Sequence, residues 1–348
     1  MTCSKIFSGD LPAELTYEVI KYFQNDDYST LHSCLLVNRL WCRLAIPLLW
    51  ENPFSINTGN YNFIEIYLHN LNDDDFNTKL NEHNIVNNSL LSNLLFNYPK
   101  FLKYLNIRKF ILSVNKWLES AIITSNTTNR SNFKVLIDIC ATIFKIFIEN
   151  KVNLHVLEIE NLSDYYHKCF VNILKLILKN TEFIHNIRNI NLFNVSNTLD
   201  YYYISQIINL QQNLKKISII YLSNFNLIEN IKQNLNYLSI DVWPDFIGLK
   251  SIESTPSSMI LQNLGQILPS KLEYLHLRLY FIKASQDILP LIKNYIMKKK
   301  RVKYLAINDS SKELISLKEV NEFKLYNIEV QRHSDLMIDL YDYIKEIN

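Results

Sequence analysis

Glycine is scarce in this sequence. The 348 residues include only four, Gly9, Gly59, Gly248 and Gly265, and no two of them are close together. Loops that cradle phosphate groups, such as Walker A and the dinucleotide-binding fingerprint, need closely spaced glycines. Their absence excludes these nucleotide-binding motifs.

Paired metal-binding or disulfide-forming side chains are also missing. Five cysteines make an odd number without paired spacing, so they form no disulfide framework. The eight histidines are scattered and offer no two pairs at zinc-finger spacing. Cys34 and Cys42 are typical of small core residues. Because no nucleophile or acid–base constellation occurs either, we expect a protein that is not an enzyme and binds no metal or cofactor.

An excess of charge of one sign is lacking. Lys and Arg number 36 against 34 Asp and Glu, a net charge of +2, which favours neither nucleic acid nor an anionic membrane as a partner. The only basic run, Lys298 to Arg301, is typical of a helix C-terminus. A nuclear-import address is the alternative interpretation.

Long uncharged apolar runs are absent too. The longest apolar stretch begins at Phe133 and carries Lys134, Asp138 and Lys145, which predicts a buried helix and no membrane span. The first residues have no apolar core of a secretory signal. We therefore expect an intracellular protein, cytoplasmic, nuclear or both.

The first fifty residues, by contrast, are rich in apolar side chains at helical spacing. Pro12 suits the first turn of a helix, and Leu15, Val19 and Tyr22 follow at i, i+4 and i+7. A second short helix is expected from about residue 29 to 35, and a third from near Asn38. The third helix is apolar on more than one face, so it needs a second partner besides its neighbours.

These helices resemble the F-box motif over residues 9–54. The residues that carry the resemblance are Leu11-Pro12-Ala13-Glu14-Leu15, Ile20, Asp27, Leu31 and Val37-Asn38-Arg39-Leu40-Trp41. The family pattern is L-P-x-E-L, an Ile five residues on, a turn, and V-C-basic-x-W, with Asn38 here where Cys is frequent. Ala45 to Pro53 resembles the segment that often follows the motif in fungal members.

The resemblance implies docking on a Skp-family adaptor and, through it, on a cullin scaffold that carries the ubiquitin-transfer machinery. The residues that would line or support this interface are Leu11, Pro12, Leu15, Ile20, Leu31, Val37 and Trp41. The alternative is that these side chains only close a small helical bundle.

Residues 55–97 are rich in Asn and Asp and are expected to form a polar linker. Asp73, Asp75 and Asn77 have the 1-3-5 spacing of a calcium loop, but Thr78 occupies the sixth position and Asn84 the twelfth. A calcium loop needs Gly and Glu there, so we predict no calcium site.

Residues 98–348 contain a recurring apolar hexad. Four copies have Tyr in third place: LKYLNI at Leu102, LNYLSI at Leu235, LEYLHL at Leu272 and VKYLAI at Val302. Weaker copies begin at Leu154, Ile187 and Leu214. The pattern L-x-x-L-x-L resembles the strand segment of leucine-rich repeats, and helix-like stretches lie between the copies.

The expected fold is therefore α/β: an N-terminal three-helix F-box, then an irregular leucine-rich-repeat-like solenoid of parallel strands and helices. From Leu154 on, spacings vary between 21 and 37 residues, and the usual Asn or Cys at the ninth position is missing. An unrelated mixed α/β domain is the alternative.

The predicted function is that of a non-catalytic substrate receptor of a cullin-type (SCF) ubiquitin ligase, whose repeat-like region binds an unknown protein substrate. A scaffold protein that uses the F-box without ubiquitin transfer is the alternative. Tyr237 and Tyr274 would bind substrate if exposed on the concave face, or else pack between repeats.

Overall fold

The computed structural model describes residues 11–23, 28–56, 59–69, 94–121, 129–160, 164–195, 198–220, 235–242, 271–279, 302–309 and 317–331. The chain divides into two compact units, Met1–Leu154 and His155–Asn348. The sequence predicts divisions after residues 54 and 97; Cα packing divides the chain after Leu154. Each unit is described by itself.

Unit 1 begins with three short helices, α1 (Ala13–Tyr22), α2 (Tyr28–Cys34) and α3 (Arg39–Leu49). Pro12 precedes α1, as expected of a residue whose missing N–H costs nothing there. Asn38 caps α3, because its Oδ1 accepts a hydrogen bond from the backbone N–H of Trp41 at 3.0 Å. The helix then ends at Leu49, and the N–H of Trp50 bonds to the carbonyl of Ile46 at 3.1 Å.

The three helices share a small core. Its buried members are Ile20, Leu31, Cys34, Ala45 and Leu48. Seven partly buried apolar side chains pack around them, Tyr17, Phe23, Tyr28, Leu35, Trp41, Leu44 and Leu49. All three helices contribute to this cluster, so the bundle is closed by its own side chains.

The rest of unit 1 is built around a cluster of aromatic rings that pack mainly edge to face. Its elements are η3 (Pro53–Ser55), α4 (Phe63–Leu68), η4 (Tyr98–Phe101), β1 (Tyr104–Asn106), α6 (Ile107–Ala121) and α7 (Asn129–Glu149). The ring centroids of Phe54 and Phe110 are 5.1 Å apart, and those of Tyr67 and Phe147 are separated by the same distance. Ile64, Tyr67 and Leu68 of α4 are buried, so part of the predicted linker is core.

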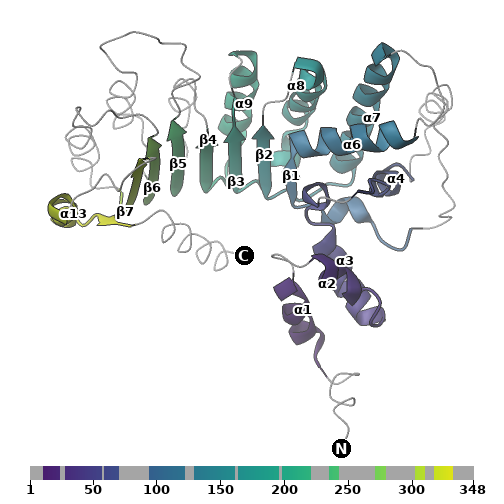
Figure 1. The fold of residues 1–348 in the computed structure, drawn as a ribbon, viewed down its shortest axis with the longest axis horizontal. Helices are drawn as coiled ribbons and strands as arrows, with labels where there is room; N and C mark the ends of the chain where they lie inside the picture. Colours follow the sequence, from purple (N-terminus) through teal and green to yellow (C-terminus); the bar gives the residue numbers. More distant parts are fainter. Residues whose placement is uncertain are drawn as a thin grey trace, which may run out of the picture. The chain divides into compact units, whose positions relative to one another are not determined.

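Unit 2 is an α/β unit with a parallel sheet (Figure 1). Its strands are β2 (Val156–Glu160), β3 (Asn189–Phe193), β4 (Lys216–Ile220), β5 (Tyr237–Val242), β6 (Tyr274–Leu279), β7 (Tyr304–Asp309) and β8 (Glu329–Val330). They are arranged in the order of the chain, and each pairs with the next in parallel. The prediction of parallel strands is confirmed.

The hexads supply β2 to β7 and their buried layer. Successive hexads are in register, so Ile217 pairs with Leu238 and Leu238 with Leu275. All three side chains are fully buried. Since alternate residues of a strand point to opposite faces, the apolar positions of the hexads form one continuous layer on one face of the sheet.

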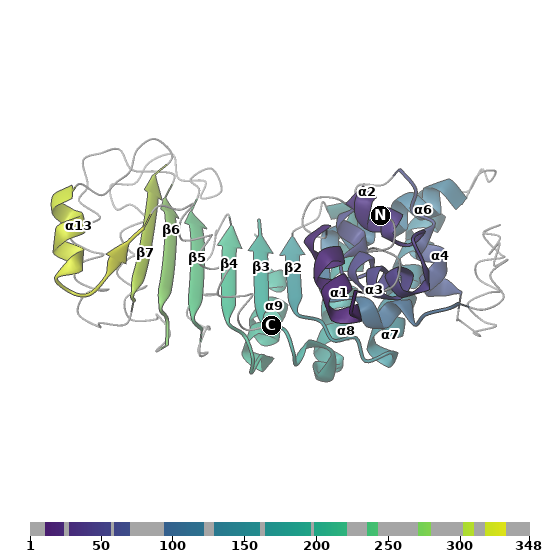
Figure 2. The same ribbon diagram turned by 90° about the horizontal axis from the view of Figure 1, so that it is seen from below.

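Described helices of unit 2 are α8 (Asp164–Lys179), η5 (Thr181–Ile184), α9 (Thr198–Leu210) and α13 (Leu317–Lys324). Figures 1 and 2 show α8 and α9 on the same side of the strands. His167 of α8 and Asp200 of α9 join these helices, with Nε2 and Oδ1 3.0 Å apart. Burial raises the pKa of Asp200, and His167 partly lowers it. Among the described residues, no helix is both long and apolar enough to cross a bilayer.

Candidate functional site

Helix α1 carries an exposed apolar stripe. Leu15, Val19 and Tyr22 follow one another at helical spacing, and Leu11 lies just before the helix, one such step earlier; all four are exposed, with 54% of Leu15 and 83% of Tyr22 accessible. Thr16 and Ile20, on another face of the helix, are buried. The helix is therefore apolar on two faces, and only one of them is covered within unit 1.

The turn between α2 and α3 adds three more exposed apolar side chains. Leu36 is 83% exposed and Val37 56%, and Leu40 is exposed in the first turn of α3. The turn is held by backbone hydrogen bonds from Leu35 to His32 and from Leu36 to Ser33. Together with the stripe on α1, these side chains form what we call the helical apolar surface: Leu11, Leu15, Val19, Tyr22, Leu36, Val37 and Leu40.

The seven residues singled out from the sequence fall into two groups. Leu11, Pro12, Leu15 and Val37 are exposed, so they can contact a partner directly. The other three point inward to different degrees: Ile20 and Leu31 belong to the bundle core, and Trp41 packs against it half-buried. The inward group can only support a binding surface by positioning the helices.

Four members of the helical apolar surface were not among those seven. Val19 and Tyr22 continue the spacing that begins at Leu15, so the i, i+4, i+7 pattern itself could have identified them. Leu36 directly precedes the motif residue Val37, and Leu40 occupies the variable position of the motif before Trp41. No periodicity indicates that these two side chains are exposed, because the turn between two helices decides it.

The hexad tyrosines Tyr237 and Tyr274 are buried in unit 2. Only 2% and 9% of their surfaces remain accessible, so the structure favours packing between strands over an exposed concave face. They lie on the face of the sheet opposite the buried Leu/Ile layer. The rings of Tyr274 and Tyr304 are stacked, with centroids 4.7 Å apart, and Tyr237 lies beside Tyr274 at 6.4 Å.

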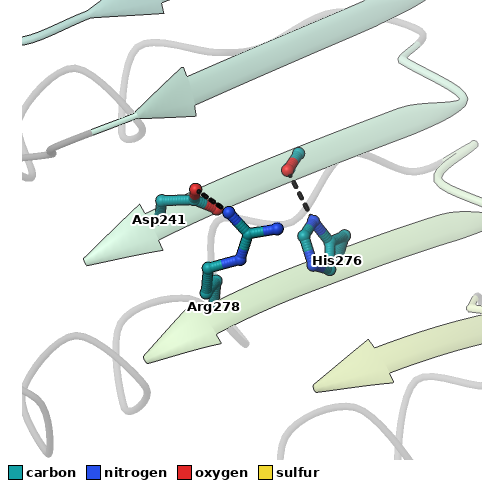
Figure 3. A network of polar contacts seen from close by, with 4 residues as sticks. Asp241, His276 and Arg278 are labelled. Atoms are coloured by element: carbon teal, nitrogen blue, oxygen red, sulfur yellow. Dashed lines mark hydrogen bonds and ion pairs between the residues drawn. The ribbon is translucent and has the colours of Figure 1, made fainter. Parts of the chain in front are cut away.

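A buried polar network lies on the same face of β5 and β6 (Figure 3). Ser239 Oγ and His276 Nδ1 are hydrogen-bonded at 2.8 Å, and Arg278 Nη1 donates to Asp241 Oδ2 at 3.1 Å. Burial raises the pKa of Asp241 to about 6, and the Arg278 guanidinium keeps it from rising further. Ser239, Asp241 and His276 are buried, and these hydrogen bonds offset the cost of burying their polar groups.

The equivalent face of β2, β3 and β4 is more accessible. Glu158, Asn191 and Ser218 occupy the same row as Ser239 and His276, and all three are half-buried. Asn191 donates a hydrogen bond to Glu158 at 3.0 Å. Lys216 lies over the ring of Tyr237 at 4.8 Å from its centroid; burial lowers the pKa of Lys216 to about 8, although Glu158 acts to raise it.

Some sequence-based interpretations concern residues outside the described ranges. These are the rejected calcium loop at Asp73, Asp75 and Asn77 and the basic run Lys298 to Arg301. Within the described ranges, no group of three or more His, Cys, Asp or Glu side chains could hold a metal ion.

The structure thus defines a class, an α/β protein whose parallel sheet is built from apolar hexads, with a helical unit before it in the sequence. Comparison with protein-family models, with curated proteins and with solved structures finds no match to this chain.

Proposed function

We propose that this protein is a non-catalytic substrate receptor of a cullin-type ubiquitin ligase. Helices α1 to α3 would dock on a Skp-family adaptor, and the sheet-bearing unit would bind the protein to be modified. Holding a target lysine near a charged ubiquitin carrier would raise its effective concentration, so the receptor needs no catalytic residues of its own.

The observation that supports this proposal is the helical apolar surface. The bundle closes its own core with Ile20, Leu31 and Leu48, yet Leu11, Leu15, Val19 and Val37 stay exposed. Exposed apolar side chains that cluster on one element are typical of protein-binding surfaces. Leu11, Pro12, Leu15 and Val37 are also the exposed positions of the F-box resemblance.

Substrate would bind on the face of β2 to β4 rather than at Tyr237 and Tyr274. The two tyrosines are buried, whereas Glu158, Asn191 and Ser218 are partly accessible and offer hydrogen-bonding groups. Such a row of polar groups suits recognition of a protein segment.

A pull-down with a Skp-family adaptor tests the docking surface. The double variant Leu15→Ala/Val37→Ala removes two exposed anchors and leaves the bundle core intact, so we expect binding to weaken at least tenfold with unchanged circular dichroism. Leu95→Ala is the matched control, because Leu95 is equally apolar and highly exposed in unit 1 but lies outside the three helices. No binding by the folded wild-type chain would overturn the proposal.

A scaffold that uses the same helices without ubiquitin transfer is the alternative. Both functions need the adaptor, so the pull-down does not separate them. Co-purification of a cullin with the chain and the adaptor supports the receptor; recovery of the adaptor without any cullin supports the scaffold.

A further inference from the structure

A small polar pocket lies on the surface of α6 in unit 1, apart from the helical apolar surface. Its volume is about 100 Å³. The described lining residues are Phe54, Ile56, Tyr61, Lys109, Leu112, Ser113 and Lys116. Most of these side chains come from α6, which Figure 1 shows. Tyr61 comes from the segment just before α4.

Three polar side chains of the pocket come from one face of α6. Lys109, Ser113 and Lys116 follow one another at i, i+4 and i+7, which places them in a row along the helix. Ser113 is only 5% exposed although it lines the pocket. The packed helix thus holds the Ser113 hydroxyl at the pocket, at a position between the two lysines along α6.

Tyr61, from the segment before α4, completes the polar lining. The ammonium of Lys116 donates a hydrogen bond to Tyr61 Oη at 3.0 Å and also lies 5.2 Å from the centre of the ring. Since Tyr61 Oη accepts this bond, its own proton remains available for donation. The pocket therefore offers two cations and two hydroxyl donors.

Among the residues that the structure describes, no acidic group neutralises the positive charge of this pocket. No carboxylate occurs among its described lining residues. Within the ranges that the structure describes, neither Lys109 nor Lys116 takes part in an ion pair. Two unneutralised ammonium groups at one small pocket attract an anion.

We propose that this pocket binds a single phosphate group, either free or carried by a monoester. A volume of about 100 Å³ is large enough for several water molecules, and so for one phosphate group. Lysine binds phosphate as a compact point charge with several donors, and the hydroxyls of Ser113 and Tyr61 donate to the remaining oxygens. Phe54 and Leu112 offer apolar surface to the organic part of an ester.

Isothermal titration calorimetry on the full chain tests this site with sodium phosphate, at constant ionic strength and with sodium chloride as reference. Lys109→Gln and Lys116→Gln each remove a charge and keep most of the side-chain length, so we expect each to weaken phosphate binding about tenfold and the pair to abolish it. Lys100→Gln is the matched control, an exposed lysine of η4 outside the pocket, and should change affinity less than twofold.

Phenyl phosphate, titrated in parallel, distinguishes the source of the phosphate group. The site is assigned to a monoester if phenyl phosphate binds at least as tightly as inorganic phosphate and this binding is lost in the double variant. The site is assigned to the free anion if inorganic phosphate binds more tightly. The proposal is overturned if phosphate binds no better than chloride. The proposal is also overturned if Lys100→Gln loses as much phosphate affinity as the pocket variants do. Unchanged phosphate affinity in a folded Lys109→Gln/Lys116→Gln variant overturns it as well.

Discussion

At the scale of single residues, buried polar groups are tolerated where a partner of the same sheet is in reach. Asp241 and Arg278 lie on neighbouring strands and face each other, as do Ser239 and His276. Sequence alone does not reveal these pairs, because their members are 37 residues apart. The alternation of the hexads, continued along each strand, assigns all four to the face opposite the Leu/Ile layer, and strand register then brings them together.

The raised pKa of Asp241 makes the stability of unit 2 depend on pH. Its folded-state pKa is about 6 against an ordinary value of 3.8. Folding therefore favours the protonated carboxyl, and this contribution is fully present below pH 4 and lost as the pH rises through 6. A shift of this size corresponds to about 3 kcal/mol.

Chemical denaturation of the wild type and of Asp241→Asn between pH 4 and pH 7 measures this effect. We expect the free energy of unfolding of the variant to fall less over this range, because Asn does not ionise. Asp164→Asn, an exposed aspartate at the start of α8, serves as the control and should keep the wild-type slope. Parallel curves for Asp241→Asn and the wild type would contradict the prediction.

At the scale of elements, α1 has one face that packs in the bundle and one that is exposed, and the proposed function assigns binding to the exposed face. Ile20 is fully buried against α2 and α3, whereas its neighbour Val19 is exposed. Removing buried methyl groups leaves a cavity, while truncating an exposed side chain does not. The two adjacent residues therefore form a matched pair for mutagenesis.

We expect Ile20→Ala to lower the free energy of unfolding by about 2–5 kcal/mol. Val19→Ala should change it by less than about 1 kcal/mol and weaken adaptor binding instead. Urea titration followed by circular dichroism measures the first effect, and the adaptor pull-down measures the second. Equal loss of stability in both variants would show that the stripe on α1 is covered within the chain.

At the scale of the whole molecule, the buried layer of unit 2 depends on every strand at once. Leu238 is in register with Ile217 on one side and Leu275 on the other, and each is completely inaccessible. A cavity at Leu238 therefore removes contacts from neighbours on both sides.

Leu238→Ala should lower the free energy of unfolding by about 2–5 kcal/mol. Ser218→Ala is a suitable comparison, because Ser218 lies on the opposite face of the adjacent strand and is half-buried. We expect this variant to lower the free energy of unfolding by less than about 1 kcal/mol. Urea unfolding midpoints of the two variants provide the measurement. A small effect of Leu238→Ala would mean that the layer collapses around the missing side chain.

Much of the architecture could be predicted from local patterns. The parallel strands follow from the hexads, and the first helices follow from Pro12, the apolar spacing and the cap at Asn38. The division of the chain could not be predicted in the same way. Composition marks residues 55–97 as polar, but Tyr67 within them packs against Phe147, a contact between segments 80 residues apart in sequence.

What the sequence by itself determined is which residues form strands and which face of the sheet each side chain occupies, because the two-residue period of a strand is a local property. Tertiary structure alone decided which of these faces are covered. The third-position tyrosines show the difference: Tyr104 is exposed, whereas Tyr237 and Tyr274 are buried in the same motif. Burial depends on neighbours that are distant in the chain, and the same holds for the two faces of α1, of which only the one bearing Ile20 meets α2 and α3.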